Sequence, residues 1–378
     1  MTDSAAPAMP ETPLREVAPL ERAGRWYHAF QRFLLQHQAL APFAQLLGAR
    51  EALGLSAKQM HDLHYKGIGF LHWRLDAKLR RQFIAAIDAF ARSQYQVDPF
   101  GPPPSHDVAA AVTALDRDGH AELPPVDPAV VADLLAWFGR EGLQPPKEEG
   151  GRGDEAPVPA SELRRSYNLG YVPRGHVLRA PHLFDLATDP ASLETARRHL
   201  GAPPILINVT AWRSFAGEEG AKEARAAQQF HFDLDDYRFC KLFVYLTDVD
   251  AAGGPHVFVP TTHRPEVIAA KRPPEGTAER EAFDAWYFKS LRKSEAEVER
   301  WLGLTPRALT GPAGTRLLVN TEGIHRGAPP ERTDRWVLQL VYGVSPFVQW
   351  GDRFEAPRYD GPEGYALQLL FSDLAAGR

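Results

Sequence analysis

The chain has 378 residues, 44% of them hydrophobic and 24% charged, a composition that excludes a chain disordered throughout. The formal charge is −5 at pH 7, so composition gives no electrostatic reason to expect nucleic-acid binding. A single cysteine excludes an internal disulfide framework and a cysteine-based zinc cluster, and a reducing, cytoplasmic location is the default expectation.

The N-terminal segment favours no regular structure. Residues 1–20 are rich in proline and alanine and predict a disordered lead-in. No basic stretch precedes an apolar core there, so we expect no signal peptide. No apolar run approaches the roughly 18 residues that span a bilayer, so we expect no membrane insertion.

Helical patterns dominate the region that follows. Apolar residues recur at helical spacing from Trp26 to Gln38 and again over 77–95. A third helix is predicted to begin at Pro128, with Asp127 as its N-cap, and to end at Gly142. The aromatic residues of these helices are expected to pack in a core, and nothing in them indicates chemistry.

The second half of the chain favours strands. A short helix is predicted before Gly201, after the cap Asp189-Pro190, and β-rich segments follow it at 205–215, 239–249, 256–260, 315–320 and 335–344. Short strands separated by turns favour a sandwich or jelly roll. A polar, helix-favouring stretch at 265–302 interrupts them and is expected to cap one end of the barrel.

These patterns predict an α+β protein with five parts. They are a lead-in, a helical region packing on the core, a mobile linker or loop rich in proline, glycine and charge, a β-rich core with a helical insertion, and a C-terminal extension. Their bounds are 1–20, 21–143, 144–159, 160–346 (insertion 265–302) and 347–378.

One constellation of residues points to chemistry. His231 and Asp233 stand two residues apart, a spacing that turns both side chains to one face of a strand. His325 follows a later predicted strand, and two histidines with one carboxylate form the facial triad that binds Fe(II) and leaves positions open. Arg335, ten residues further on, carries a planar fork suited to a dicarboxylate. Alone, His-x-Asp is equally typical of a surface loop.

In these residues the sequence resembles the phytanoyl-CoA dioxygenase family of Fe(II)/2-oxoglutarate oxygenases. The resemblance covers roughly residues 160–345 and includes HFD, the stretch KLFVYLTDVDAAGGPHVFVPTTHR, the later histidine and the arginine. It implies a double-stranded β-helix flanked by helices. It also implies that His231, Asp233 and His325 ligate iron, and that Arg335 grips the distal carboxylate of 2-oxoglutarate.

The sequence departs from the family after the second histidine. Family members often carry glycine and serine there, whereas this chain has Arg326-Gly327-Ala328. A hydroxyl partner for the cosubstrate must come from elsewhere, and we expect Thr321 to supply it.

Further cavity residues are candidates by strand alternation. Lys241, Phe243 and Tyr245 share one face of their strand, and we expect Lys241 to contact the cosubstrate and Tyr245 the substrate, although Lys241 at a solvated strand edge is the alternative. Asn208 and Trp212 alternate on an earlier strand and are expected to contact substrate.

Other polar residues near the motifs are assigned structural roles. Asp235 and Asp236 are expected to be solvated loop acids, with a hydrogen bond to a ligand histidine as the alternative. His256 and His263 are expected to stabilise turns. Arg332 is a rival to Arg335 that we expect to lie in the turn.

The resemblance implies an enzyme that uses Fe(II), 2-oxoglutarate and O2 to hydroxylate an unactivated C–H bond of a small molecule, with succinate and CO2 as coproducts. The presence of the triad carboxylate favours hydroxylation or desaturation over halogenation. Two alternatives stay open. The same site could catalyse desaturation, cyclisation or epimerisation, or the chain could be a non-catalytic binding protein on a jelly-roll scaffold. The sequence does not indicate the oligomeric state, nor whether the substrate is free, CoA-bound or carrier-bound.

Overall fold

The computed structural model describes residues 16–17, 57–94, 107–146, 155–217, 226–344 and 353–354. Within the expected lead-in, β1 (Glu16–Val17) pairs antiparallel with β11 (Arg353–Phe354). The helix expected from Trp26 to Gln38 lies outside the described residues, as do the rest of the lead-in and nearly all of the C-terminal extension.

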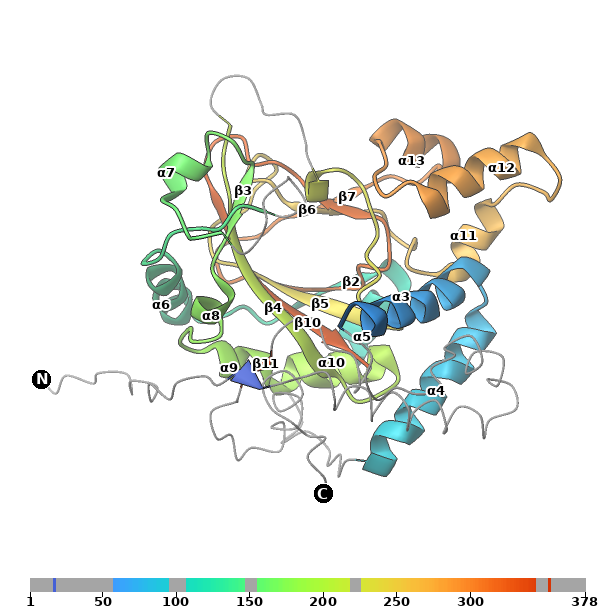
Figure 1. Ribbon diagram of the computed structural model, residues 1–378, viewed down its shortest axis with the longest axis horizontal. Helices are drawn as coiled ribbons and strands as arrows, with labels where there is room; N and C mark the ends of the chain where they lie inside the picture. Colours follow the sequence, from blue (N-terminus) through green and yellow to red (C-terminus); the bar gives the residue numbers. More distant parts are fainter. Residues whose placement is uncertain are drawn as a thin grey trace, which may run out of the picture.

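Two antiparallel sheets face each other in the body of the protein (Figure 1). The larger has the strand order β2-β8-β5-β10-β4-β3 and the smaller β7-β6-β9. The bounds are β2 His120–Leu123, β3 Leu169–Tyr171, β4 Ile205–Ser214, β5 Phe239–Tyr245, β6 His256–Phe258, β7 Arg307–Leu309, β8 Arg316–Val319, β9 His325–Gly327 and β10 Arg335–Gly343.

The path of the chain between these sheets defines the fold. From β4 the chain crosses to the smaller sheet, where His231 pairs with His325 of β9 in a single bridge, and returns to β5. The chain crosses again to the smaller sheet for β6 and β7 and returns to the larger sheet for β8. It crosses once more for β9 and comes back to the larger sheet as β10. This alternation is that of a double-stranded β-helix within an α+β protein, so the expected fold class is confirmed.

Two faces of the larger sheet serve different purposes. Every residue of β5 is buried because helices cover its outer face and the second sheet faces the inner one. Cys240, Leu242 and Val244 point outward into the main core, which includes residues of α4 (Ala77–Gln94) and α10 (Pro190–Leu200). Alternate residues such as Phe243 and Tyr245 point inward.

Local signals place most of the predicted helices. α4 matches the helix predicted over 77–95. α6 (Pro128–Phe138) begins as expected, with the Asp127 side chain accepting a hydrogen bond from the Ala129 backbone N–H, but it ends one turn before Gly142. A Cβ at Gly142 would lie 2.8 Å from the Val158 carbonyl oxygen, so this glycine permits a close backbone approach and does not end the helix. α10 is capped by Asp189 and Gly201 as predicted.

The region 21–143 is not wholly helical, contrary to expectation. α5 (Val108–Asp118) ends at Gly119, whose φ of +85° turns the chain into β2. β2 pairs with β8 and forms one edge of the larger sheet. A Cβ at Gly119 would lie 2.4 Å from the Phe258 ring, so only glycine fits this turn. The region also contains α3 (Ala57–Arg74).

The expected linker at 144–159 is tied down at its described ends. Leu143 pairs with Val158, and Gln144 with Tyr171 of β3, through backbone hydrogen bonds of 2.8–2.9 Å. Residues 147–154 lie outside the described part of the chain. Three short helices complete this side of the barrel: α7 (Ala160–Leu163), α8 (Arg174–Val177) and α9 (Leu183–Ala187).

The stretch 265–302 is helical, as predicted. It forms α11 (Pro265–Lys271), α12 (Ala278–Asp284), η4 (Ala285–Lys289) and α13 (Glu295–Leu302) beside the sheets (Figure 1). Phe283, Trp286 and Val298 form a second core with Phe230, and the Lys293 backbone N–H donates to the Phe230 carbonyl at 2.8 Å. The insertion therefore packs directly against the segment that leads into His231.

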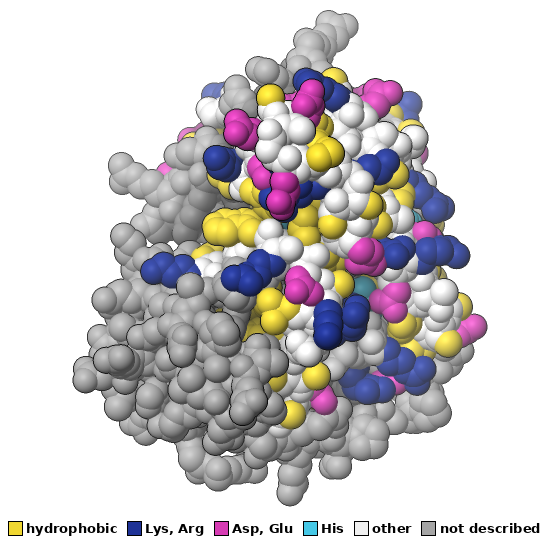
Figure 2. Space-filling model, turned by 90° about the vertical axis from the view of Figure 1, so that its right-hand side faces the viewer, with side chains coloured by type: hydrophobic (Ala, Val, Ile, Leu, Met, Phe, Trp, Pro, Cys, Tyr) yellow, Lys and Arg dark blue, Asp and Glu magenta, His cyan; other side chains and the backbone are white. Residues whose placement is uncertain are grey.

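The described surface carries mixed charge. On the face seen in Figure 2, lysines and arginines are interspersed with aspartates and glutamates. Among the described residues, none of the helices has the length and apolar character needed to cross a membrane.

Candidate metal centre and adjoining cavity

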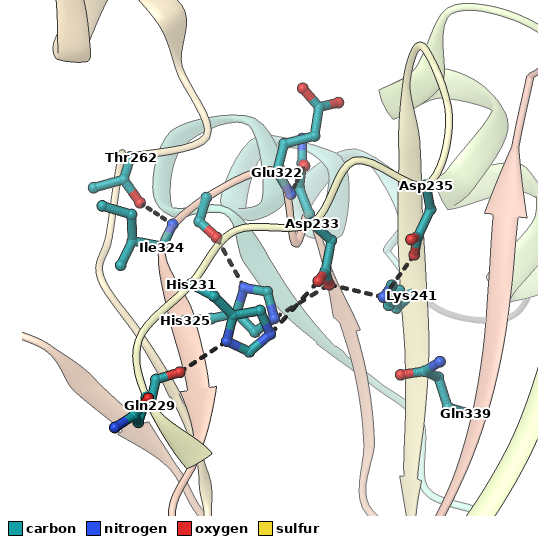
Figure 3. Close-up of polar contacts among 12 residues, drawn as sticks. Gln229, His231, Asp233, Asp235, Lys241, Thr262, Glu322, Ile324, His325 and Gln339 are labelled. Atoms are coloured by element: carbon teal, nitrogen blue, oxygen red, sulfur yellow. Dashed lines mark hydrogen bonds and ion pairs between the residues drawn. The ribbon is translucent and has the colours of Figure 1, made fainter. Parts of the chain in front are cut away.

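His231 and Asp233 meet a side chain from far along the chain, His325, between the two sheets. One ligand atom from each of His231, Asp233 and His325 lies within 4.8 Å of the other two (Figure 3). His231 and His325 exchange backbone hydrogen bonds of 2.9 and 2.8 Å, and the Asp233 backbone N–H donates to the Thr321 carbonyl at 2.9 Å. The bridge between the His231 segment and β9 therefore assembles the group.

Both imidazoles have a fixed orientation. Nδ1 of His231 donates to the Gln229 carbonyl at 2.8 Å, and Nδ1 of His325 donates to the Gly323 carbonyl at 2.9 Å. A carbonyl oxygen can only accept, so each Nδ1 carries a proton and each ring turns its Nε2 toward Asp233, at 3.5 Å for His231 and 3.3 Å for His325. Burial, and then the neighbouring His325, lower the pKa of His231 to about 3, which keeps it neutral.

The carboxylate of the group is held by a buried lysine. Lys241 Nζ lies 2.7 Å from Oδ2 of Asp233 and 2.7 Å from Oδ2 of Asp235 (Figure 3). Burial opposes ionisation of Asp233, but Lys241 and His325 outweigh it and hold its pKa well below the ordinary range. Burial likewise opposes charge on Lys241, yet the two carboxylates raise its pKa. Lys241 lines the cavity, with its ammonium engaged by two acids.

The expectation that Asp235 and Asp236 are solvated loop acids is wrong. Asp235 pairs with Lys241, and burial raises its pKa. Asp236 is 2% exposed and accepts backbone hydrogen bonds from Tyr237 at 2.7 Å and Val344 at 2.6 Å. The turn after the metal-motif strand therefore folds inward.

Arg335 is a buried cation without an acidic partner among the described residues. It is 5% exposed, and its Nη2 donates a hydrogen bond to Ser214 Oγ at 3.1 Å. Its Nε has no hydrogen-bond partner within the described part of the chain, and burial lowers the pKa of the guanidinium. A buried charge normally needs a counter-ion, so this site calls for an anion.

Arg335 and the triad open onto one cavity of about 530 Å³. Asn208, Trp212 and Tyr245 line it, in agreement with the alternation of their strands. The Tyr245 hydroxyl donates to the Leu309 carbonyl at 2.7 Å and accepts from the His256 backbone N–H at 3.0 Å, so both of these hydrogen bonds of the hydroxyl are made within the protein.

Thr321 does not lie where a cosubstrate hydroxyl partner is needed. It is fully buried, does not line the cavity, and its Oγ1 has no hydrogen-bond partner among the residues that the structure describes. The hydroxyl beside Arg335 belongs to Ser214, which the sequence analysis missed. Its inward direction could be read from the alternation of Asn208 and Trp212, whereas its pairing in register with Arg335 is visible only in the structure.

His256 is closer to the site than expected. It lines the cavity, and its ring stacks on His325 with centroids 5.1 Å apart. Burial holds its pKa well below the ordinary value. His263 has a structural contact, with Nε2 3.0 Å from the Asp116 carbonyl oxygen, and Arg332 pairs with the exposed Asp250 outside the cavity.

No protein-family model and no curated protein matches this sequence. Among solved structures, the non-heme alpha ketoglutarate dependent epimerase SnoN from nogalamycin biosynthesis is 18% identical, with a TM-score of 0.41 over 66% of this chain and 85% of that one. HygX from Streptomyces hygroscopicus, with nickel, 2-oxoglutarate and hygromycin B bound, is 17% identical (TM-score 0.42; 64% and 89%). EctD from S. alaskensis, with 2-oxoglutarate and 5-hydroxyectoine, is 18% identical (TM-score 0.39; 66% and 82%). At these identities and TM-scores, function must be argued from the site itself.

Proposed function

We propose that this chain is a non-haem Fe(II)/2-oxoglutarate-dependent oxygenase that hydroxylates a C–H bond of a small molecule. One observation carries the proposal. A buried guanidinium without an acidic partner in the described chain shares a cavity with two imidazoles and a carboxylate. Together they provide for a metal ion and an anionic cosubstrate.

The donor set suits ferrous iron. Nε2 of His231, Nε2 of His325 and one oxygen of Asp233 would hold the metal as a facial triad, which leaves positions for the cosubstrate and dioxygen. When bound, iron and 2-oxoglutarate supply the oxidising chemistry, in which 2-oxoglutarate and O2 yield succinate and CO2 and the second oxygen atom enters the substrate.

Arg335 and Ser214 fit the distal carboxylate of 2-oxoglutarate. The guanidinium fork binds two carboxylate oxygens at once, and the Ser214 hydroxyl already lies 3.1 Å from Nη2. Binding would give a buried cation its counter-ion, so the free-energy gain includes relief of an existing penalty.

Lys241 and Asp235 hold the carboxylate of the triad in place and have no contact with Arg335. The ammonium occupies Oδ2 of Asp233 and leaves Oδ1 for the metal, which favours binding through one carboxylate oxygen. Asp235 fixes Lys241 in turn. We therefore assign Lys241 to positioning Asp233, in place of the cosubstrate contact expected from sequence.

Succinate release tests the proposal. Purified protein loaded anaerobically with Fe(II) should bind 2-oxoglutarate and slowly release succinate when air is admitted, even without substrate. Asp233→Ala should abolish both metal binding and succinate release. Binding of 2-oxoglutarate without any succinate would favour the non-catalytic binding protein, and no binding of iron would refute the oxygenase. Product analysis with a found substrate would separate hydroxylation from desaturation, cyclisation or epimerisation.

A further inference from the structure

Neutral polar side chains form part of the cavity wall where a barrel interior is usually apolar. Asn208 and Thr210 of β4 and Gln339 of β10 line the cavity and are half-buried. The strand register pairs Thr210 with Gln339 directly. We call Asn208, Thr210 and Gln339 the polar floor.

The polar floor is separate from the site proposed for 2-oxoglutarate. Gln339 follows Arg335 by four residues on one strand, which at about 3.4 Å per residue is a separation of roughly 14 Å. A five-carbon dicarboxylate is shorter than this Cα–Cα separation, so one gripped by Arg335 spans only part of it. Asn208 and Lys241 both pair with Val341, so the polar floor lies at the end of the sheet from which Lys241 reaches Asp233.

The polar floor has hydrogen-bonding capacity to spare. Asn208 Oδ1 accepts from Arg174 Nη1 at 3.3 Å, and Gln339 Nε2 donates to Thr210 Oγ1 at 3.3 Å. Within the described chain, the Asn208 amide nitrogen, the Gln339 carbonyl oxygen and the Thr210 hydroxyl proton have no protein partner. None of them is sealed from solvent, so they open onto the cavity. In the empty cavity these groups hydrogen-bond to water, so a ligand that covers them must itself supply hydrogen bonds in place of that water.

An apolar wall faces the same space from the side of β3 and α8. Leu169, Val172 and Val177 line it, and the rings of Tyr171 and Trp212 lie beside it with centroids 6.2 Å apart. The cavity thus offers hydrogen bonds from the sheet and apolar contact from one side. A compact molecule with polar groups on one side satisfies both, whereas a hydrocarbon chain satisfies only the second.

We infer that the substrate is a compact polar molecule whose hydroxyl or amide groups hydrogen-bond to the polar floor, and that long acyl chains are excluded. This inference rests on the proposed function, because it takes the free part of the cavity as the substrate site. The polar floor acts against acyl chains by leaving its own groups unpaired beneath them.

An uncharged long-chain alcohol, whose ten-carbon chain stands in for an acyl chain, tests this without knowledge of the substrate. Binding of 1-decanol to the Fe(II)- and 2-oxoglutarate-loaded protein is measured by calorimetry for the parent chain and for the double variant Asn208→Leu/Gln339→Leu. We expect the variant to bind 1-decanol at least about tenfold more tightly. Its affinity for 2-oxoglutarate should stay within about threefold of the parent value, because the polar floor lies beyond that site. Equal 1-decanol affinity, or loss of 2-oxoglutarate binding by a folded variant, would overturn the inference.

A second arm keeps the test decisive if the double variant does not fold. Succinate release by the parent protein is measured with polyols, N-acetyl amino acids, lauroyl-CoA and palmitoyl-CoA. Stimulation by either acyl-CoA contradicts the inference. Stimulation confined to polar compounds supports it, and if no compound stimulates, the single variant Gln339→Leu and 1-decanol decide. Failure of the oxygenase proposal would be separate, since then no sample would release succinate at all.

Discussion

Replacing Arg335 by methionine should stabilise the cosubstrate-free protein while it destroys cosubstrate binding. The guanidinium is 5% exposed with no acidic partner among the described residues, so its desolvation is not repaid. Replacing even a buried ion pair by apolar side chains of similar volume is often neutral or stabilising by about 1–4 kcal/mol, and Arg335 has no paired acid whose attraction would be lost. We expect the unfolding free energy of the apo variant to rise by an amount in that range.

The same change removes the partner of the distal carboxylate. Breaking a buried ion pair on one side costs about 3–5 kcal/mol, which corresponds to a loss of 2-oxoglutarate affinity of roughly 100-fold or more. When free 2-oxoglutarate is present at 100 times the dissociation constant of the parent protein, it should stabilise the parent by about 2.7 kcal/mol. At the same concentration the variant should gain almost no stability. Arg335→Lys keeps the charge and loses the fork, so an intermediate affinity is expected.

Urea unfolding with and without 2-oxoglutarate, together with calorimetric titration, measures both effects. Arg332→Met is the matched control, because Arg332 pairs with Asp250 at the surface and does not line the cavity. It should change neither stability nor 2-oxoglutarate affinity appreciably. The reasoning is refuted if Arg335→Met binds 2-oxoglutarate as the parent does, or if the apo variant is markedly less stable.

Three further outcomes are expected. Lys241→Met should weaken Fe(II) binding by about 10–100-fold, measured by competition with a chromophoric chelator, because Asp233 loses the cation that orients it; unchanged affinity would remove Lys241 from the site. Burial lowers the pKa of His72 and of His231 to about 3, below the unfolded value near 6.5, so the unfolded state binds more protons between these pH values. Apo stability should therefore fall, by up to about 1.4 kcal/mol per pH unit for each such histidine, as pH drops from 6.5 toward 4; urea curves at pH 7 and pH 5 with equal midpoints would contradict this. Asp127→Ala should cost about 1 kcal/mol in thermal unfolding, since it removes the cap of α6, whereas Asp127→Asn should retain most of it.

Sequence patterns predicted the elements that local chemistry specifies. Asp127 and Asp189 cap their helices as expected, and the five strands predicted from β-branched and aromatic runs correspond to β4, β5, β6, β8 and β10. The missed strands of the two larger sheets, β2, β3, β7 and β9, are three or four residues long and gain their conformation from a neighbour and not from their own composition.

The site shows the same division. The meeting of His231, Asp233 and His325 could be anticipated from motif order, and the structure places them together. The role of Ser214 could not, because it depends on which residue of β4 pairs with Arg335. The inward direction of Asp235 could not be anticipated either. A charged turn is ordinarily solvated, and Asp235 turns inward because it pairs with Lys241 of β5.

Strand β2 has a consequence for how this protein can be dissected. It belongs to the N-terminal region yet hydrogen-bonds along β8, and the turn before it packs on Phe258 of the opposite sheet. A fragment that starts at residue 160 would keep every side chain of the proposed metal centre but expose the unpaired backbone of β8. Such an edge invites pairing between molecules, so the shortened protein should self-associate, and the N-terminal region has to be included in any minimal soluble version.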